Sequence, residues 1–455
     1  MINLKITKNQ LFTALGEDVM PVVGFYAPPD ESEWQGKQYP SLKTDAVFQK
    51  IKEAGFNVTF QMNDPIESKP ESVARSIALC EKYGIQYMVC SDTLYRKFNW
   101  REEDNIAEET EKARALLTVR RFKEALSPYV SRKSFAGLYV WDEPTKEALP
   151  YLGEILSVYR QAMTELGYPE KTYYVNLLPW LAGSGLNAKE YDEYLSMAVE
   201  KAGLEYLSYD FYPFRKREYI RQSFPEVDTG ISPGVFNLTA QVREVALRYD
   251  VPFWAFVQMG GNWSEETDNI SVRRPLPSEV LWEVNLFLAF GAKGIQYFTL
   301  CNPVSYFKYL KNGGETGAFL PDGTPSDLYE AAREANCQIA ACDEILMHCK
   351  STQMILHGPA PTAIEYSVGI VRETNYRELL SVSGAPAFIG CFDFKGKTVL
   401  YVLHNRATGG CGEIELMFGG RQKLRIIDAT RDERKEDSRL KFCLKAGAAV
   451  LVSVE

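Results

Sequence analysis

Short apolar runs alternate with amphipathic segments along the first three quarters of the chain. Each run is rich in β-branched and aromatic residues, and its length is typical of a β-strand. The segments between the runs have the apolar spacing of helices that cover a sheet, as in DAVFQKIKEAG at 45–55 and LGEILSVYRQAMTELG at 152–167. The eight runs occupy residues 21–29, 55–63, 84–92, 135–144, 171–180, 204–214, 251–260 and 294–303.

This alternation predicts parallel βα units, because parallel strands need a crossover helix between them. Eight units are the number that closes a (β/α)8 barrel, or TIM barrel, and the helical pattern at 326–350 completes its outer ring. A doubly wound open sheet is the alternative, but no glycine-rich phosphate turn follows the first strand. We therefore predict an α/β barrel domain over residues 1–348.

Residues 349–455 show a different pattern, in which apolar and polar residues alternate and helical spacing is absent. Turn signals such as KGK at 395–397 and ATGG at 407–410 separate the runs. This pattern predicts a small antiparallel β-sandwich as a C-terminal domain. The charged run RDERKEDSR at 431–439 is expected to form a solvated hairpin tip.

Composition narrows the classes of partner. The chain has 455 residues, 45% hydrophobic content and a formal charge of −9, and its scattered basic residues argue against binding to nucleic acid or to an anionic membrane. No stretch approaches the roughly 20 apolar residues that span a bilayer, and the N-terminus lacks the apolar core of a signal peptide. We expect a soluble protein, cytoplasmic, or periplasmic or secreted if a signal peptide has been removed.

The distribution of histidine and cysteine limits the chemistry. The three histidines, His348, His357 and His404, lie in the last quarter of the chain. A barrel without histidine cannot use a Ser/His/Asp relay, a Cys/His pair or a zinc ion held by histidines. The nine cysteines contain no CxxC pair, so neither a disulfide framework nor a zinc ribbon is indicated. We expect no metal and no cofactor, and carboxylates and tyrosines remain as catalytic groups.

The fourth run, FAGLYVWDEP at 135–144, ends in two adjacent carboxylates and a proline. Side chains of barrel strands alternate between the helix layer and the interior, and active sites form at the carboxyl ends of the strands. If the aliphatic residues of this run face the helices, Trp141 and Glu143 face the interior. Glu143 then lies at the mouth of the barrel, whereas Asp142 points away unless the chain kinks before the proline.

The same alternation places many polar groups inside the barrel. On the second run it turns Phe60 outward and Thr59 and Gln61 inward. Buried polar groups need hydrogen-bond partners, so an interior this rich in amides and hydroxyls exceeds the needs of a structural core and favours a sugar site. The predicted inward polar residues are Asn57, Thr59, Gln61, Asn63, Asn176, Ser208, Gln258 and Gln296.

Three carboxylates, Asp92, Glu143 and Asp210, are predicted to face inward at the mouth. Glycoside hydrolysis needs one protonated carboxyl group that assists the leaving oxygen and one ionised group that activates water or attacks the sugar. We expect Glu143 to be the acid, with a pKa raised by aromatic surroundings and by a neighbouring carboxylate. Asp210 or Asp142 is its partner, and Asp92 is expected to be structural.

Aromatic and amide side chains near the strand ends are candidates for sugar binding. Indole rings can stack on the apolar face of a pyranose, and amides and phenols can bind its hydroxyl groups. The loop FRKRE at 214–218 offers Arg215 or Arg217 to an acidic sugar, although a solvated loop is the simpler interpretation. The candidate substrate-binding residues are Tyr26, Asn63, Trp141, Asn176, Trp180, Tyr212, Gln258 and Trp263.

Three motifs resemble those of a known enzyme family. Strand four ending in W-D-E-P, strand six reading S-Y-D-F-Y-P and the block LWEVNLFLAFGAKGIQYFTL at 281–300 are similar to the barrel glycoside hydrolases of the large retaining superfamily, especially the family 42 β-galactosidase type. The resemblance covers about residues 20–345. It implies that the glutamate ending strand four, here Glu143, is the acid/base.

The chain departs from that family at the end of strand seven, where the family carries its nucleophilic glutamate and this sequence has AFVQMGGNW. Gln258 cannot attack a sugar carbon. Asp210 can supply the second carboxylate instead. Alternatively, Asp142 and Glu143 resemble the adjacent Asp-Glu pair of the barrel hexosaminidases, which use the acetamido group of the substrate as nucleophile.

The sequence therefore predicts a glycoside hydrolase that cleaves a glycosidic bond in an oligo- or polysaccharide with carboxylate acid/base catalysis. The alternative is a carbohydrate-binding barrel protein that has lost the strand-seven nucleophile and does not hydrolyse its ligand. A lyase or a metal-dependent isomerase is a third interpretation, with Asp92, Glu143 and Asp210 as its carboxylate cluster. A carbohydrate is the expected partner, and the sugar, the linkage and the oligomeric state are left open.

Overall fold

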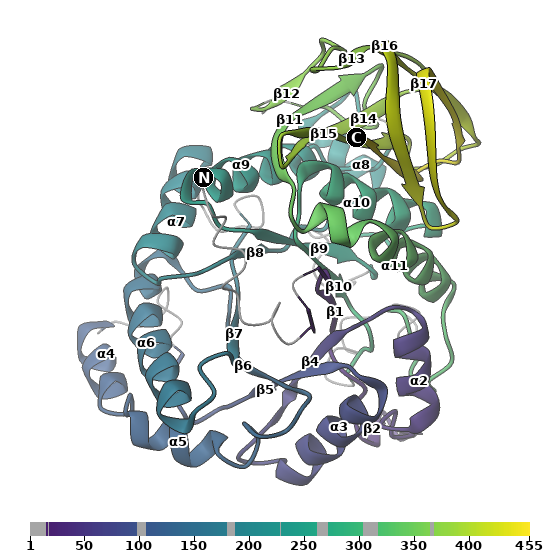
Figure 1. Cartoon of the computed structure of the whole chain (residues 1–455). Coiled ribbons are helices and arrows are strands. Elements are labelled where there is room, and N and C mark those ends of the chain that lie inside the picture. The colour runs from purple at the N-terminus through teal and green to yellow at the C-terminus, as the bar shows by residue number, and fades with distance from the viewer. Residues whose placement is uncertain are drawn as a thin grey trace.

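A closed barrel forms the larger part of the molecule. The computed structural model describes residues 15–16, 18–97, 106–179, 187–227, 229–261, 272–303, 317–364 and 368–455. Within these ranges, eight parallel strands form one sheet in the order β7-β6-β5-β4-β1-β10-β9-β8. A parallel bridge between Leu177 and Tyr209 joins the two ends of that order, so the sheet closes into the ring seen in Figure 1. The predicted (β/α)8 barrel is confirmed.

The barrel strands coincide with the apolar runs of the sequence, except that the second strand continues two residues beyond its run, to Pro65. Parallel strands covered on both faces need apolar side chains at nearly every position, which explains why the runs are almost continuous. The strands are β1 (Val22–Phe25), β4 (Val58–Pro65), β5 (Gln86–Cys90), β6 (Phe135–Asp142), β7 (Thr172–Asn176), β8 (Leu207–Tyr209), β9 (Phe253–Gln258) and β10 (Gly294–Phe298).

Helices surround the barrel, and several begin and end at the expected signals. The side chain of Thr44 caps the first turn of α2, and Gly167 ends α6 with a left-handed φ of 86°, a conformation that costs glycine little. The helices are α2 (Asp45–Glu53), α3 (Pro70–Tyr83), α4 (Ile106–Arg114), α5 (Val119–Leu126), α6 (Leu149–Leu166), α7 (Ala188–Glu200), α8 (Arg217–Ser223), α9 (Gly234–Tyr249), α10 (Pro277–Phe290), α11 (Asp327–Leu346) and the short 3-10 helix η2 (Lys146–Ala148). In the described ranges, no helix combines the length and apolarity that a membrane crossing requires.

The C-terminal part is a β-sandwich. Its long strand β16 changes partners at a register shift between Met417 and Gln422: the first half pairs with β13 and the second half with β18. The two layers made in this way enclose a separate hydrophobic core. The strands are β11 (Lys350–His357), β12 (Ile370–Val371), β13 (Leu379–Gly384), β14 (Ala387–Phe394), β15 (Lys397–His404), β16 (Gly412–Asp428), β17 (Arg431–Leu444) and β18 (Ala449–Val454).

The charged run at 431–439 differs from its prediction. It forms the first part of strand β17 and pairs with β16, rather than making a hairpin tip. Most of its side chains are exposed, and Arg425 of β16 binds Asp432 across the pair at 2.9 Å. Charged side chains are typical of an edge strand, because they discourage pairing with another chain.

The sandwich packs against α10 and α11 on the outside of the barrel (Figure 1). Trp282 of α10 donates to the Asn405 side chain at 3.1 Å, and Asn285 donates to the Gly447 carbonyl at 2.8 Å. Tyr401 completes this contact with a 2.6 Å bond to Asn285. Since α10 lies between two hydrophobic layers, its residues from 279 to 290 are all buried. The division of the chain into domains at residue 348 stays a prediction.

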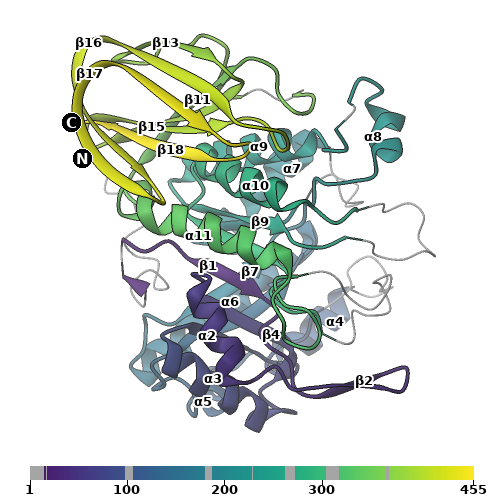
Figure 2. The ribbon, with the colours of Figure 1, turned by 90° about the vertical axis from the view of Figure 1, so that its right-hand side faces the viewer.

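A short hairpin and a short helix stand on one side of the barrel. The hairpin, β2 (Ser32–Trp34) and β3 (Lys37–Tyr39), follows β1, and α8 follows β8. Figure 2 shows both on the same side. This side holds the carboxyl ends of the barrel strands, where (β/α)8 barrels carry their active sites.

Candidate active site

Aromatic rings fill the interior of the barrel. The ring of Phe25 lies 4.6 Å from Phe60, 6.4 Å from Tyr139, 5.4 Å from Phe256 and 5.3 Å from Phe298, measured between ring centres. These rings come from five different strands and meet mostly edge to face, an arrangement that stabilises aromatic clusters. They form the hydrophobic floor beneath the mouth of the barrel.

Phe60 faces this interior, so the predicted orientation of the second strand is wrong. Thr59 turns away and donates to the Gly24 carbonyl at 2.8 Å, and the Gln61 amide donates to the Ala27 carbonyl at 2.7 Å. The residue before the strand, Asn57, uses its amide on the backbone of the segment that leads into β1. The prediction turned the apolar residues of this strand toward the helices, whereas aromatic rings fill the interior of this barrel, so the two faces were assigned in reverse.

A chain of hydrogen bonds crosses the interior between β7, β8 and β10. Tyr174 donates to Gln296 at 2.5 Å, Gln296 donates to Ser208 at 2.8 Å, and Ser208 donates to Asn176 at 3.0 Å. All four side chains are buried. Asn176, Ser208 and Gln296 thus face inward as predicted. Their bonds bind the side chain of Asn176 in one orientation at the carboxyl end of β7.

A bulge in β6 sets the direction of the Asp-Glu pair. Tyr139 pairs with Tyr174 and Trp141 with Val175, so one extra residue lies between them on β6. One extra residue turns each later side chain of the strand to the opposite face of the sheet. Trp141 is buried with its ring edge-on to Tyr151 of α6, so it faces the helix layer, opposite to the prediction.

The next two residues both reach the mouth. Asp142 faces inward because of the bulge, and its carboxylate meets the Asn176 amide. Glu143 has a left-handed φ of 53° and donates its N–H to the Asn176 carbonyl at 2.9 Å. A following proline favours extended geometry, but Glu143 does not adopt it. A left-handed backbone is unusual for a glutamate, and such strain is concentrated at functional sites.

Three carboxyl groups and one amide form what we call the carboxyl cluster: Asp142, Glu143, Asp210 and Asn176. The Asn176 amide donates to Asp142 at 3.2 Å and to Asp210 at 2.7 Å, so those two carboxyl oxygens are at most about 6 Å apart. A side-chain hydrogen bond from Glu143 is one of the interactions that lower the pKa of Asp210, and two carboxyl groups can share such a bond only if one of them holds a proton.

Asp210 is the member of the cluster whose proton is held most firmly. Burial raises its pKa to about 7, and the negative charge of Asp142 adds to this effect, while hydrogen bonds from Asn176 and Glu143 oppose it. Burial also raises the pKa of Asp142, against the Asn176 hydrogen bond and the positive charge of Lys97. Burial thus raises the pKa of both candidate partners of Glu143, and the raised pKa expected for Glu143 itself stays a prediction.

Lys97 is a residue of the site that the sequence analysis missed. Its ammonium lies 5.3 Å from the centre of the Tyr139 ring, at the top of the interior layer, and its charge lowers the pKa of Asp142. It follows β5 in the segment SDTLYRKF. The sequence signal that could have identified Lys97 is its position soon after the carboxyl end of a predicted barrel strand.

Tyr26 and Tyr212 lie together on another part of the mouth. Their rings pack on Phe298 at 5.9 and 5.4 Å. Tyr26 has a left-handed φ of 63° at the end of β1. Phe298 was also missed, although the inward direction of Gln296 implies that the residue two positions later faces the same way. These rings form an aromatic wall at the mouth.

Gln258 lies at the position of the missing glutamate. Its side-chain amide forms hydrogen bonds with backbone atoms. Its amide oxygen accepts the Phe214 N–H at 2.9 Å, and its nitrogen donates to the carbonyls of Gly260 at 2.9 Å and Arg273 at 2.7 Å. Its own N–H donates to the buried Glu283 at 2.9 Å. Gln258 therefore joins the segments that follow β8 and β9.

The remaining predicted residues are peripheral. Asn63 is exposed, and Asp92 is exposed with its N–H bound to Glu67 at 3.2 Å. Trp180 and Trp263 lie outside the described residues. Within the described ranges, no group of three or more histidine, cysteine, aspartate or glutamate side chains is arranged to hold a metal ion.

No protein-family model and no curated protein matches the sequence. Solved structures provide a likeness of fold. Eubacterium rectale Amy13B has 10% identity over 96% of each chain, with a TM-score of 0.50. A putative α-L-fucosidase from Bacteroides thetaiotaomicron has 12% identity over 70% of this chain and 94% of its own, with a TM-score of 0.45. A family GH27 β-L-arabinopyranosidase from Geobacillus stearothermophilus has 10% identity over 98% of each chain, with a TM-score of 0.46.

Proposed function

We propose that this chain is a glycoside hydrolase that cleaves a glycosidic bond in an oligo- or polysaccharide by carboxylate acid/base catalysis. The observation that carries the proposal is the bridge that the Asn176 amide makes between Asp142 and Asp210, at 3.2 and 2.7 Å, at the mouth of a barrel. Burial raises the pKa of Asp210 to about 7, so a proton is held there beside the carboxylate of Asp142. A proton donor next to a second carboxyl group is what glycoside hydrolysis requires.

Glu143 and Asp210 act together as the acid in this proposal. Glu143 is exposed and extends into the mouth, whereas Asp210 is 7% exposed and lies beneath it. A pKa of about 7 keeps Asp210 protonated in a large part of the molecules at neutral pH, which is the condition for an efficient acid. Glu143 gives its own proton to the leaving oxygen, and protonated Asp210 beneath it can restore a proton to the Glu143 carboxylate.

Asp142 is the ionised partner. Lys97 and the Asn176 amide both favour its charged form. The Asn176 bridge keeps the carboxylate of Asp142 beside the acid pair, with its oxygen at most about 6 Å from that of Asp210. We propose that Asp142 attacks the sugar, in which case the configuration at the anomeric carbon is retained.

The wall of Tyr26, Tyr212 and Phe298 would receive the apolar face of the sugar. Trp180 and Trp263, which follow β7 and β9 in the sequence, remain candidates for a second stacking surface. We assign supporting roles to the other predicted binding residues, since their side chains are occupied within the protein. These residues are Trp141, Asn176 and Gln258.

A panel of nitrophenyl glycosides tests the proposal. We expect release of nitrophenol from at least one β- or α-glycoside, and proton NMR of the first product should show the anomer of the substrate. The panel should pair each hexoside with its N-acetylhexosaminide, because a requirement for the acetamido group would instead make that group the nucleophile. Absence of hydrolysis across the panel and across soluble polysaccharides would contradict the proposal.

A further inference from the structure

The loop between β1 and α2 carries a hairpin, residues 32–39, that we call the arm. Gln35 and Gly36 form its tip with left-handed φ values of 50° and 77°. Two consecutive left-handed residues make the tight turn that matches the twist of paired strands. In Figure 2 the arm projects from the barrel on the side of the strand carboxyl ends.

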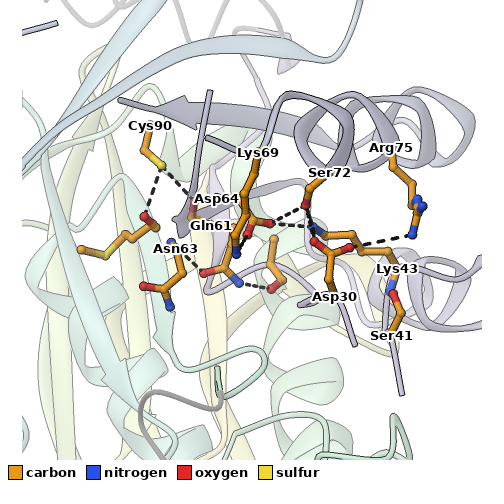
Figure 3. Close-up of polar contacts among 12 residues, drawn as sticks. Asp30, Ser41, Lys43, Gln61, Asn63, Asp64, Lys69, Ser72, Arg75 and Cys90 are labelled. Atoms are coloured by element: carbon orange, nitrogen blue, oxygen red, sulfur yellow. Dashed lines mark hydrogen bonds and ion pairs between the residues drawn. The ribbon is translucent and has the colours of Figure 1, made fainter. Parts of the chain in front are cut away.

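A buried ionic network, which we call the socket, holds both ends of the arm (Figure 3). Asp30 precedes the arm and Lys43 follows it, and their side chains meet at 3.0 Å. Lys43 also binds Asp64 at the end of β4 at 2.6 Å. Ser72 of α3 bonds to all three of these groups. The arm is therefore attached at its base to both a barrel strand and a helix.

The socket is rigid because its central charge is removed from water. The side chain of Lys43 is 0% exposed and that of Asp64 is 3% exposed, and a buried charge that loses its partner is strongly destabilising. Lys69 and Arg75 neutralise the outer carboxylate oxygens at 3.0 and 3.8 Å. A two-stranded hairpin is marginally stable by itself in water. The socket thus fixes the position of a structure that would otherwise be mobile.

One face of the arm is aromatic. Trp34 lies opposite Lys37, and Ser32 lies opposite Tyr39, so these four side chains share a face. Lys37 lies 5.0 Å from the centre of the Tyr39 ring. The other face holds the hydrogen-bonded pair Glu33 and Gln38. Trp34 remains partly exposed near the tip of the arm.

The arm belongs to the rim of the barrel mouth. It follows β1, and the charge of Lys37 acts on Asp322 in the loop after the neighbouring strand β10. The pKa of Asp322 is lowered mainly by hydrogen bonds from Thr324 and further by Lys37. The aromatic face therefore lies at the same end of the barrel as the carboxyl cluster.

We propose that the arm is a distal glycan-binding subsite, in which Trp34 stacks on a sugar unit of a chain that extends beyond the carboxyl cluster. This inference rests on the proposed function and adds a substrate class, namely a polymeric or long oligomeric glycan. An aromatic ring that is already held in position loses little conformational entropy when it binds a sugar, so a rigid arm favours binding. A second copy of the chain fits less well, because a stable dimer needs about 800 Å² per partner and the arm offers a face of only four side chains.

The chain-length dependence of hydrolysis tests the subsite. The readout is the ratio of kcat/KM for an oligosaccharide of six or more units to kcat/KM for the nitrophenyl glycoside of one unit. Loss of one aromatic stacking contact should lower this ratio about five- to tenfold in W34A. The matched control is Y168A, which removes a partly exposed ring between α6 and β7, at the opposite end of the barrel. An equal ratio in wild type and W34A would overturn the proposal.

A binding experiment separates the subsite from the catalytic proposal. Affinity electrophoresis in gels that contain soluble β-glucan, xylan or β-galactan needs no turnover. We expect at least one polysaccharide to retard the wild type and Y168A, and to retard W34A less. The absence of hydrolysis by the wild type, together with weaker retardation of W34A than of the wild type in the gels, would contradict the proposed hydrolase function and support the subsite. Equal migration of wild type and W34A in every gel would overturn the subsite.

Two further measurements test whether the arm is rigid and whether a glycan or a second copy of the chain binds to it. D30N removes one carboxylate of the socket, and we expect faster trypsin cleavage after Lys37, together with a reduced chain-length ratio. An unchanged cleavage rate and ratio would show that the socket does not control the arm.

Sedimentation velocity of wild type and W34A tests self-association. A dimer that W34A dissociates without a change in the ratio would assign the arm to a subunit interface and overturn the proposal.

Discussion

The socket and the carboxyl cluster are two polar clusters at the same end of the barrel, and they treat their carboxylates in opposite ways. Asp30 of the socket and Asp210 of the carboxyl cluster are both largely removed from water, with 26% of the Asp30 side chain and 7% of Asp210 exposed. In the socket, burial raises the pKa of Asp30, but hydrogen bonds from Ser72 and Lys43 outweigh it and the pKa is lowered. In the carboxyl cluster, the pKa of Asp210 rises to about 7.

The difference lies in the neighbouring groups. The socket surrounds its carboxylates with Lys43, Lys69 and Arg75, whereas the carboxyl cluster places its acids beside one another and an amide. An amide lowers a carboxylate pKa less than a buried ammonium does, and a second carboxylate raises it. The same residue type is therefore a fixed charge in one cluster and a proton donor in the other.

The largest expected effect is the loss of turnover in E143Q. Glutamine keeps the shape of Glu143 but cannot deliver a proton, so kcat on the best nitrophenyl glycoside should fall roughly 10²- to 10⁴-fold. The control is E147Q, an exposed glutamate four residues later, which should leave kcat unchanged. Near-normal turnover in E143Q would remove Glu143 from the mechanism.

The second effect is a loss of stability in K43M. Methionine leaves Asp30 and Asp64 buried without their shared ammonium, which should lower the free energy of unfolding by about 3–5 kcal/mol. Urea unfolding followed by circular dichroism measures the change. K69M is the control, because Lys69 is 46% exposed and its ion pair should contribute less than about 1 kcal/mol. Equal losses of unfolding free energy in K43M and K69M would contradict the conclusion that buried Lys43 stabilises the fold more than exposed Lys69 does.

The third effect is a change in the pH dependence of stability in D210N. A carboxyl group whose pKa is raised in the folded state stabilises the fold below pH 4, and this contribution is lost as pH rises to about 7. For a shift of this size the loss is roughly 2–4 kcal/mol. Urea unfolding of wild type at pH 4.5 and 8 should show this loss, and D210N should show a smaller one. An identical pH dependence in both proteins would contradict a protonated Asp210.

The smallest effect is a shift of the pH–rate profile in N176A. The Asn176 hydrogen bonds lower the pKa of both Asp142 and Asp210, so their removal should move the profile of kcat/KM upward by about one pH unit. S208A is the control, because Ser208 contacts Asn176 but neither carboxyl group of the cluster accepts from it. If both variants shift the profile equally, the amide acts through the interior network rather than directly.

The sequence predicted more of the fold than of the site. Each of the eight barrel strands coincides with a predicted run, apart from the last two residues of β4, since two-sided burial leaves a strong local pattern. Glu143 and Asp210 were both predicted to lie at the mouth. The facing of Phe60 was wrong because the prediction turned apolar side chains toward the helices, whereas aromatic rings fill this barrel. The facing of Trp141 was wrong because the bulge in β6 has no clear sequence signal.

The sequence by itself determined the order of the elements and the kind of side chain at each strand end, because periodicity and capping act over a few neighbouring residues. Only the tertiary structure decided which carboxylate keeps a proton. Asp210 depends on Asn176 and on Asp142, which lie 34 or more residues away along the chain. A pKa responds to distance and burial in space, and closure of the barrel is what brings these groups together.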